Sequence, residues 1–254
     1  MTYRIKRIRS SFAAAALLLA LPALADDEGA EWLVAPYAWI PDVSLEQSPG
    51  DVGGGVSGSD LLDKTDAAGM IRIEVAKNRW GLTLDYIFLS LSDTRVIDTP
   101  GPIFPDPVSV IAELDLSVVE LGGVYRPSGD DTGIQFLGGY RGISSNTTVL
   151  ATPEDGLTQR VDTDAGLADV FVGARYLFRY NRWDFAVRGD YSFGDSEGML
   201  NLLGSVGFRF NDVFALQGGY RQAVLEYKET SEQGDATSTE IELGGPFLGL
   251  VFRF

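Results

Sequence analysis

The chain of 254 residues contains no cysteine and no histidine. Without cysteine there is no disulfide framework, no thiolate zinc site, no cysteine nucleophile and no lipidated cysteine anchor. Without histidine, the usual general base near neutral pH and the commonest metal ligand are both missing. Basic residues are scarce, with 20 Lys and Arg against 36 Asp and Glu, and the formal net charge is -16. We therefore expect no cofactor, no metal and no nucleic-acid partner, because phosphate contacts require basic patches.

The first 25 residues have the three parts of a secretory signal peptide. Four basic residues precede an uncharged run, residues 12–24, that is rich in Ala and Leu. Ala23 and Ala25 then offer the small residues of a cleavage site, and Asp26 follows them. The run is shorter than the about 20 residues of a transmembrane helix, although an uncleaved anchor is the alternative. We predict a signal peptide over residues 1–25 and one domain over 26–254, either soluble in an exported compartment or a membrane barrel.

The rest of the chain alternates apolar and polar residues with the period of two that indicates β-strands. Between Trp183 and Phe193 every second residue is apolar or aromatic, apart from one glycine, and Asp184, Arg188 and Asp190 lie between them. The same pattern recurs in residues 71–75, 82–88, 169–178 and 200–210. The sequence therefore predicts an all-β protein.

Two all-β architectures fit this alternation. A soluble sandwich packs its apolar faces together and leaves polar faces in water, where Lys, Thr and Glu are usual. Here the polar faces carry Arg, Asp, Glu, Gly, Ser and Asn with almost no Lys, and Tyr, Trp and Phe gather near the strand ends. This distribution favours a membrane barrel with a lipid-facing apolar band, aromatic girdles and a polar lumen.

Short and long connections alternate, as in outer-membrane barrels, which have short periplasmic turns and longer outer loops. Tight turns are expected at residues 77–79, 127–131, 180–182 and 211–212. Longer polar segments lie at about 41–66, 94–107, 150–165, 194–198 and 229–237. An even number of strands would place both termini in the periplasm.

Counting the strands predicts a closed antiparallel up-and-down transmembrane β-barrel of about ten strands, with eight or twelve as alternatives. Residues 43–47 and 51–56 would extend the first two strands as an outer hairpin. The ten expected strands are 31–40, 67–78, 80–93, 108–126, 133–149, 166–180, 182–193, 199–210, 213–228 and 238–254.

The alternation slips at two places. Glu113 and Asp115 occupy odd positions, whereas Glu120 and Gly122 continue the polar face at even positions. One extra residue near 117–119, a β-bulge, would explain the change. A similar slip near 244–246 predicts a second bulge, where a proline is tolerated.

The chain ends in a strand in which every second residue from the terminus is apolar: Phe254, Phe252, Leu250 and Leu248. This strand resembles the assembly signal of Gram-negative outer-membrane barrels, which the barrel-assembly machinery reads. The whole chain resembles small proteobacterial outer-membrane barrels similar to the opacity-type surface proteins, on residues 32–39, 78–86, 219–221 and 245–254. The resemblance implies a barrel in the cell outer membrane of a Gram-negative bacterium, in contact with outer-membrane lipid and lipopolysaccharide. It brings no catalytic motif and indicates no oligomeric state.

A ten-strand barrel is narrow, because about eight strands leave room only for side chains and open aqueous pores appear near 16 strands. Buried charges must be paired and hydrogen-bonded, and Arg can bridge carboxylates bidentately. We expect a salt-bridged plug, with a selective filter for a small charged solute as the alternative. The charged residues predicted to face the lumen are Arg72, Glu74, Asp85, Glu113, Asp115, Glu120, Arg141, Asp169, Arg175, Asp184, Arg188, Asp190, Arg209, Arg221, Glu242 and Arg253.

Three functions remain open from sequence alone. The first is a barrel without enzymatic activity that has a structural, surface-interaction or envelope-integrity role, and the second is a narrow porin-like channel. The third is an enzyme that uses a carboxylate pair such as Glu113 and Asp115 for acid–base chemistry. Omptin-like proteases use Asp with His, and outer-membrane phospholipase and lipid A deacylase use Ser with His, so none of these sites can form here. The acidic outer loops could share divalent cations with lipopolysaccharide, although a solvated surface explains them as well.

Overall fold

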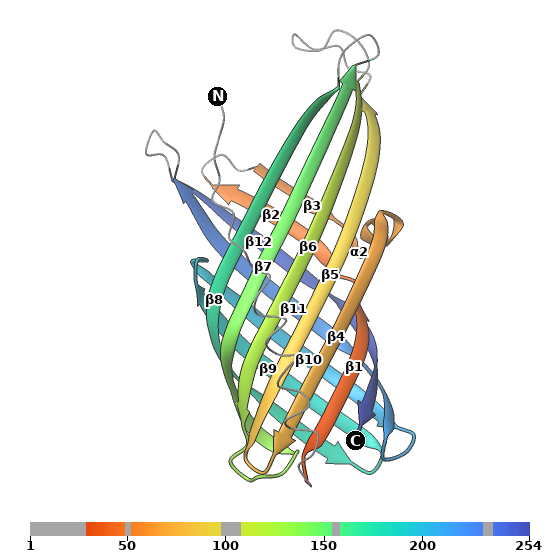
Figure 1. The fold of residues 1–254 in the computed structure, drawn as a ribbon, viewed down its shortest axis with the longest axis vertical. Helices are drawn as coiled ribbons and strands as arrows, with labels where there is room; N and C mark the ends of the chain where they lie inside the picture. Colours follow the sequence, from red (N-terminus) through yellow and green to blue (C-terminus); the bar gives the residue numbers. More distant parts are fainter. Residues whose placement is uncertain (1–28, 49–51, 98–107, 154–157, 231–235) are drawn as a thin grey trace.

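A computed structural model describes residues 29–48, 52–97, 108–153, 158–230 and 236–254. The predicted signal peptide, residues 1–25, and its cleavage residues Ala23, Ala25 and Asp26 lie outside the described residues. The described chain forms a tall barrel of tilted strands (Figure 1).

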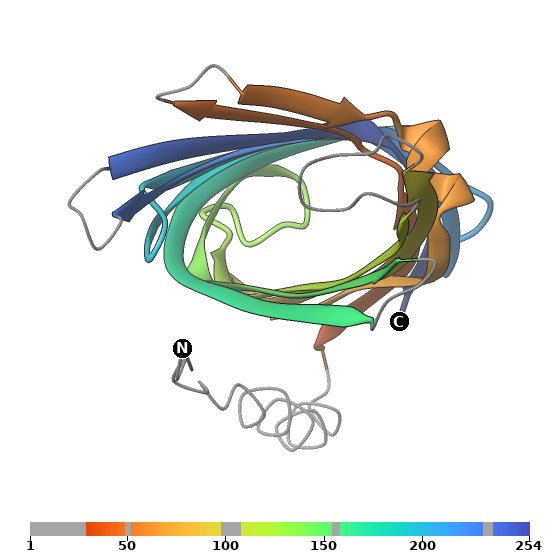
Figure 2. The ribbon, with the colours of Figure 1, turned by 90° about the horizontal axis from the view of Figure 1, so that it is seen from above.

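Ten antiparallel strands close the barrel, as the alternation predicts. Each strand pairs with the next one along the chain, and β1 closes the circle by pairing with β12. Figure 2 shows the closed ring from above. The barrel strands are β1 (Glu31–Trp39), β4 (Thr65–Lys77), β5 (Trp80–Ile97), β6 (Val108–Tyr125), β7 (Gly133–Pro153), β8 (Gln159–Tyr180), β9 (Trp183–Gly194), β10 (Gly198–Arg209), β11 (Phe214–Thr230) and β12 (Ala236–Arg253).

A hairpin of β2 (Asp42–Ser48) and β3 (Val52–Val56) lies between β1 and β4 in the chain, followed by the short helix α2 (Gly58–Asp63). The predicted outer hairpin is therefore present. β2 continues the line of β1 along β12, but β3 pairs with β2 and does not pair with β4. Within the described chain no helix is long and apolar enough to cross a membrane.

The short turns and both ends of the barrel sequence share one end of the molecule, which we call the short-turn end. Asn78 and Asn181 begin the two tightest turns with φ of 54° and 53°, a left-handed conformation that Asn tolerates better than most residues. The backbones of Trp32 and Phe254 exchange two hydrogen bonds of 3.0 Å at this same end. The β2–β3 hairpin lies at the opposite end, together with the strand ends that the longer connections join (Figure 1), and we call this the long-loop end.

The outward positions of the strands are apolar and exposed. Trp80 is 68% exposed, Leu248 is 59% exposed, and Tyr140 and Tyr176 are about half exposed. Charged side chains such as Arg141 occupy the opposite face and are buried. A barrel that exposes an apolar surface and buries its charges belongs in lipid rather than in water.

The two predicted β-bulges are wrong. β6 keeps one uninterrupted register with both β5 and β7 through residues 117–119, and β11 pairs with β12 without a break through residues 244–246. A register shift occurs instead in β4, between Thr65 and Ala67.

Because the register is continuous, Glu113, Asp115 and Glu242 lie on the outer face and not in the lumen, which corrects the prediction for these three residues. Asp115 accepts a hydrogen bond of 2.6 Å from the Ser90 hydroxyl on that outer face. The physical reason is strand length. β6 has 18 residues with a rise of about 3.3 Å each, so the strand is longer than the apolar band of a barrel, which is about 25 Å tall. Beyond the lipid the outer face meets water, and it becomes polar without any slip in register.

Candidate functional site

The lumen at mid-height is filled by a network of charged side chains around Arg141. Its guanidinium donates to Glu120 Oε2 at 2.7 Å, to Asp190 Oδ1 at 2.5 Å and to Ser192 Oγ at 3.3 Å. Arg188 donates from the other side to Glu120 Oε1 at 2.5 Å and to Asp190 Oδ2 at 2.7 Å. Two guanidinium groups and two carboxylates therefore form a closed ring that joins β6, β7 and β9. The side chain of Arg141 is 0% exposed.

The same network reaches around the barrel toward β1. The Asn201 amide donates to Asp190 Oδ2 at 2.7 Å, and Arg221 donates to Asn201 Oδ1 at 2.9 Å. The Arg221 guanidinium also lies 4.9 Å from the centre of the Trp39 ring. A cation over an aromatic face is attracted by the ring quadrupole, so the network ends in an aromatic contact on β1. We call Glu120, Arg141, Arg188, Asp190, Ser192, Asn201 and Arg221 the central network.

Phe171 supports the central network from β8. Its side chain is 0% exposed, and the guanidinium carbons of Arg141 and Arg188 lie 5.2 and 5.7 Å from its ring centre. Gly122 of β6 faces the same ring, and a Cβ on this glycine would come within 2.9 Å of it. The sequence thus places a glycine on one wall to make room for a phenylalanine from another.

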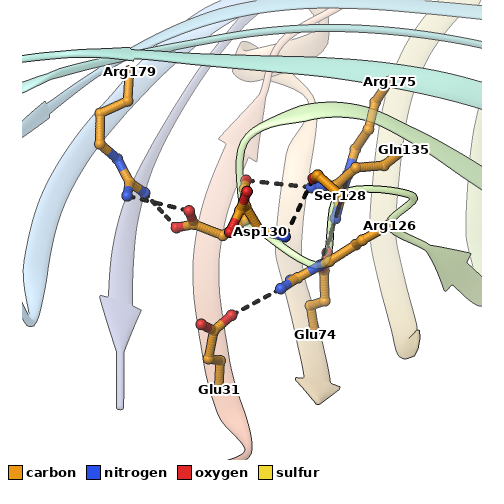
Figure 3. Close-up of polar contacts among 9 residues, drawn as sticks. Glu31, Glu74, Arg126, Ser128, Asp130, Gln135, Arg175 and Arg179 are labelled. Carbon is orange, nitrogen blue, oxygen red and sulfur yellow. Dashed lines mark hydrogen bonds and ion pairs between the residues drawn. The ribbon is translucent and has the colours of Figure 1, made fainter. Parts of the chain in front are cut away.

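A second cluster spans the lumen nearer the short-turn end (Figure 3). Arg175 of β8 makes a bidentate ion pair with Glu74 of β4, with one N–O distance of 2.6 Å. Gln135 accepts a hydrogen bond of 2.8 Å from Arg175 Nε. β4 and β8 are separated by three strands in the barrel wall, so this pair ties distant parts of the wall together.

The β6–β7 turn, residues 126–132, is anchored across the short-turn end rather than lying free, and we call it the lid. Arg126 donates to Glu31 Oε2 at 2.8 Å and to Glu74 Oε1 at 3.2 Å. At the other end of the lid, Asp131 accepts a hydrogen bond of 2.6 Å from Arg179 of β8. Figure 2 shows this turn inside the outline of the barrel. Burial disfavours the charged form of Arg126, but its hydrogen bonds and ion pairs with Glu31 and Glu74 outweigh that cost and raise its pKa above the usual value.

The carboxylate of Asp184 contacts three arginine side chains at the short-turn end. It accepts from Arg179 at 3.0 Å and from Arg253 at 2.9 Å, and Arg209 lies 3.3 Å away. These residues come from β8, β9, β10 and β12. One carboxylate therefore links four strands that contribute to the short-turn end.

Asp85 and Asp169 each bind hydroxyl groups. Tyr37 donates its hydroxyl proton to Asp85 Oδ1 at 2.7 Å, beside a pocket of about 40 Å³ that Arg72 and Arg221 also line. A pocket of this size has room for water. Asp169 accepts hydrogen bonds from Ser192 at 3.0 Å and from the Ser196 hydroxyl at 2.6 Å.

The structure places the remaining predicted lumen residues on the inner face, but in separate clusters rather than one network. Several partners were not predicted. Some are neutral or aromatic side chains, which a search for charge overlooks, and the charged ones lie at strand ends or in the β6–β7 turn. Tyr37 and Trp39 lie on an inner face of β1 that otherwise carries Glu31, Leu33 and Ala35, so its alternation contains only one charged residue. The unpredicted partners are Glu31, Tyr37, Trp39, Arg126, Asp131, Gln135, Phe171, Arg179, Ser192, Ser196 and Asn201.

We expect the Arg126→Met variant to destabilise the barrel by about 2 kcal/mol, the scale of a lost hydrogen bond to a charged group. Glu74 keeps its pair with Arg175, and Glu31 has a largely exposed side chain, so neither carboxylate is left fully uncompensated. Urea unfolding in lipid vesicles measures the change. Arg182→Met, at an exposed turn position, is the matched control and should change stability by less than about 0.5 kcal/mol. Equal losses in the two variants would contradict the anchoring role of Arg126.

Within the described residues no group of three or more Asp or Glu side chains is arranged to hold a metal ion. The carboxylates of the lumen are instead engaged by arginine, hydroxyl and amide donors. In this arrangement each buried carboxylate lies next to donors that compensate its charge, and these contacts hold the walls of a narrow barrel together.

No protein-family model matches the chain, and no curated protein sequence does. Solved outer-membrane barrels do match it. The outer membrane protease OmpT from Escherichia coli is aligned over 90% of this chain and 98% of that chain, with 8% identity and a TM-score of 0.50. The translocator domain of the autotransporter NalP from Neisseria meningitidis is aligned over 95% and 94%, with 13% identity and a TM-score of 0.47. The chain thus has the fold of an outer-membrane β-barrel, closed by ten antiparallel strands.

Proposed function

We propose that this protein is a sealed outer-membrane barrel with a structural or surface-interaction role, and that it is neither a channel nor an enzyme. The short-turn end, which carries both barrel termini, faces the periplasm, and the long-loop end faces outward. This orientation follows the general pattern of short periplasmic turns and longer outer loops.

The observation that carries the sealed state is the burial of side chains that face the lumen, from its middle toward the short-turn end. Arg141, Phe171, Gln135 and Val124 all point inward and are at most 1% exposed. Side chains that solvent cannot reach leave no room for a hydrated ion beside them. The lid adds a second closure at the short-turn end.

The long strands β5 to β8 extend beyond the membrane at the long-loop end, and we call this part the β5–β8 extension. Its outer face supports the surface role. Strands β7 and β8 run for 21 and 22 residues, about twice the length that a barrel strand needs to cross a membrane. Asp162 on this extension is hydrogen-bonded by the Thr148 hydroxyl at 2.8 Å and by Arg160, and these bonds lower the pKa of Asp162. The surface is therefore polar, and Asp162 on it is ionised at neutral pH.

The predicted assembly residues fit recognition of β12 during insertion. Leu248, Leu250 and Phe254 are exposed on the outer face of the closing strand, and Phe252 lies on that face between them. We propose that the barrel-assembly machinery reads these side chains, and that acidic groups at the long-loop end share cations with lipopolysaccharide. The proposal of no catalysis rests on the lack of His and Cys and on the outward position of the Glu113 and Asp115 pair at a wet surface.

Planar-bilayer recording tests the sealed state against the channel alternative. The purified barrel, inserted into the bilayer, should give no stable unitary current in potassium chloride. A refolded open porin in the same bilayer is the positive control for insertion and detection. A stable current that scales with salt concentration would overturn the sealed state and favour a narrow solute channel.

A further inference from the structure

A small pocket lies in the lumen beside the central network, with a volume of about 40 Å³. Its charged lining residues are Arg72 of β4, Asp85 of β5 and Arg221 of β11, and Tyr37 of β1 also lines it. One water molecule needs about 10 to 15 Å³ of comparable space. The pocket therefore has room for a monatomic ion as well as for water.

Arg72 has a hydrogen-bond donor that its protein neighbours do not use. Its Nη2 atom is buried and has no hydrogen-bond partner among the described residues. Asp85 lies directly opposite Arg72 in the β4–β5 ladder, but no ion pair of 4.0 Å or less joins the two within the described chain. The Asp85 carboxylate instead accepts the Tyr37 hydroxyl proton at 2.7 Å. A buried charged donor without an acceptor is costly, and an acceptor in the pocket would remove that cost.

The direct contacts of Arg221 among the described residues are neutral. Its Nε atom donates to the Asn201 amide oxygen at 2.9 Å, and its guanidinium carbon lies 4.9 Å from the centre of the Trp39 ring. Neither contact brings a full negative charge to this buried arginine. The two carboxylates of the central network are already shared by the other two arginines of that network.

The charges around the pocket do not cancel. Two guanidinium groups, those of Arg72 and Arg221, line it with one carboxylate, that of Asp85, and this leaves an excess of one positive charge. The neighbouring cluster cannot supply the difference, because Glu74 and Glu31 are paired there with two other guanidinium groups. A buried charge is costly unless an opposite charge compensates it. Water brings an acceptor but no charge, whereas a monovalent anion brings both.

We propose that this pocket binds a monovalent inorganic anion, a halide such as chloride, between the guanidinium groups of Arg72 and Arg221. The anion accepts a hydrogen bond from Arg72 Nη2 and neutralises the excess positive charge. Organic ligands usually occupy pockets of about 300 Å³ or more, so the pocket is too small for an organic solute. The site depends neither on the orientation of the barrel nor on its role at the surface.

The place of the site in the wall gives the anion a structural role. β12 and β1, the two strands whose pairing closes the barrel, lie between β11 and β4 in the strand order. Arg221 comes from β11 and Arg72 from β4. An anion held by both arginines therefore connects the strands on either side of the closure, and we expect it to stabilise the closed barrel.

Urea unfolding in lipid vesicles tests the site, with sodium chloride replacing sodium gluconate at constant ionic strength. Gluconate is an organic anion too large for the pocket, so it serves as the reference. A ligand that binds only the folded state stabilises it in proportion to its concentration and affinity. We expect chloride to raise the folding equilibrium constant by a factor of about 3 or more, the gain at a concentration of twice the dissociation constant. Equal stability in the two salts would overturn the proposal.

Three variants separate this site from a general effect of salt. Arg72→Gln should abolish the chloride dependence, whereas Asp85→Asn, which removes the opposing carboxylate, should increase it. Arg209→Gln is the matched control, because Arg209 is a lumen arginine that does not line the pocket, and it should keep the dependence of the wild type. Equal dependence in all three variants would overturn the proposal. The two opposite shifts are read independently, so Asp85→Asn still decides if Arg72→Gln does not fold.

Bromide locates the ion directly, because it replaces chloride and scatters anomalously. Crystals of the full barrel grown in sodium bromide should show an anomalous peak in contact with Arg72 Nη2 and the Arg221 guanidinium. Bromide peaks confined to the outer surface of the barrel, with only water in the pocket, would overturn the proposal. Planar-bilayer currents are recorded separately, so failure of the sealed state and failure of this proposal give different readouts.

Discussion

Replacing Arg141 with methionine is expected to destabilise the barrel by about 3 to 5 kcal/mol, the cost of breaking a buried ion pair on one side. Arg141 and Arg188 each pair with both Glu120 and Asp190, and the side chain of Arg141 is inaccessible to solvent. After the substitution, Arg188 alone faces two buried carboxylates. Urea unfolding in lipid vesicles, followed by tryptophan fluorescence, measures the loss.

A triple variant separates the effect of uncompensated charge from the effect of lost packing. Arg141→Met/Glu120→Gln/Asp190→Asn removes all three charges and should recover more than half of the stability, because well-packed neutral groups often replace a buried ion pair without cost. Arg160→Met removes an exposed arginine and should change stability by less than about 1 kcal/mol. If the single and the triple variants are equally unstable, uncompensated charge is not the cause.

Replacing Phe171 with alanine is expected to cost about 3 to 5 kcal/mol, the range for truncating a buried aromatic residue. Its ring is fully buried inside the lumen and supports Arg141 and Arg188. Val124 and Leu137 pack in the same buried cluster, and Gly122 on the facing strand has no side chain that could fill the space. We therefore expect a lasting cavity rather than collapse.

Phe178→Ala is the matched control for this loss. Phe178 lies on the same strand but on the outer face, where it is 50% exposed. Its removal should cost about 1 to 2 kcal/mol, since lipid chains can fill the space that the ring leaves and no cavity remains. A larger loss at Phe178 than at Phe171 would mean that the interior contact contributes less than lipid contact, contrary to the structure.

Much of the fold could be predicted from sequence because a period of two carries two kinds of information. It identifies strands, and in a narrow barrel it also assigns each side chain to lipid or lumen. The tight turns at Asn78 and Asn181 were recognisable because short polar turns separate long alternating runs. Strand number followed from these turns, and β12 closes on β1 as an even count of antiparallel strands requires.

The errors in the predicted lumen residues arose at positions where a charged residue no longer indicates the inner face of a strand. Glu113, Asp115 and Glu242 suggested a slipped register because their parity differs from that of Glu120, but the strands had merely left the lipid. Nothing in a local pattern reports how far a strand projects beyond the membrane. The inward position of the lid was equally inaccessible, because the partners of Arg126 are 52 and 95 residues away in the chain.

Several charged clusters were predicted as one group because sequence gives a face but no height along the barrel axis. Arg175 and Glu74 lie 101 residues apart and meet across the lumen, while Asp184 gathers a separate set of arginines at the short-turn end. Pairing of specific charges depends on strand tilt and barrel diameter, and both emerge only once the sheet closes.

The coupling energy between Glu74 and Arg175 tests most directly the central claim that paired charges fill this lumen. Urea unfolding is measured for the wild type, Glu74→Gln, Arg175→Met and the double variant. We predict that each single substitution is strongly destabilising and that the double variant is no worse than the poorer single one, with a coupling energy of about 2 to 3 kcal/mol. Additive losses in the double variant would show that the two side chains do not interact across the barrel, and would contradict this account.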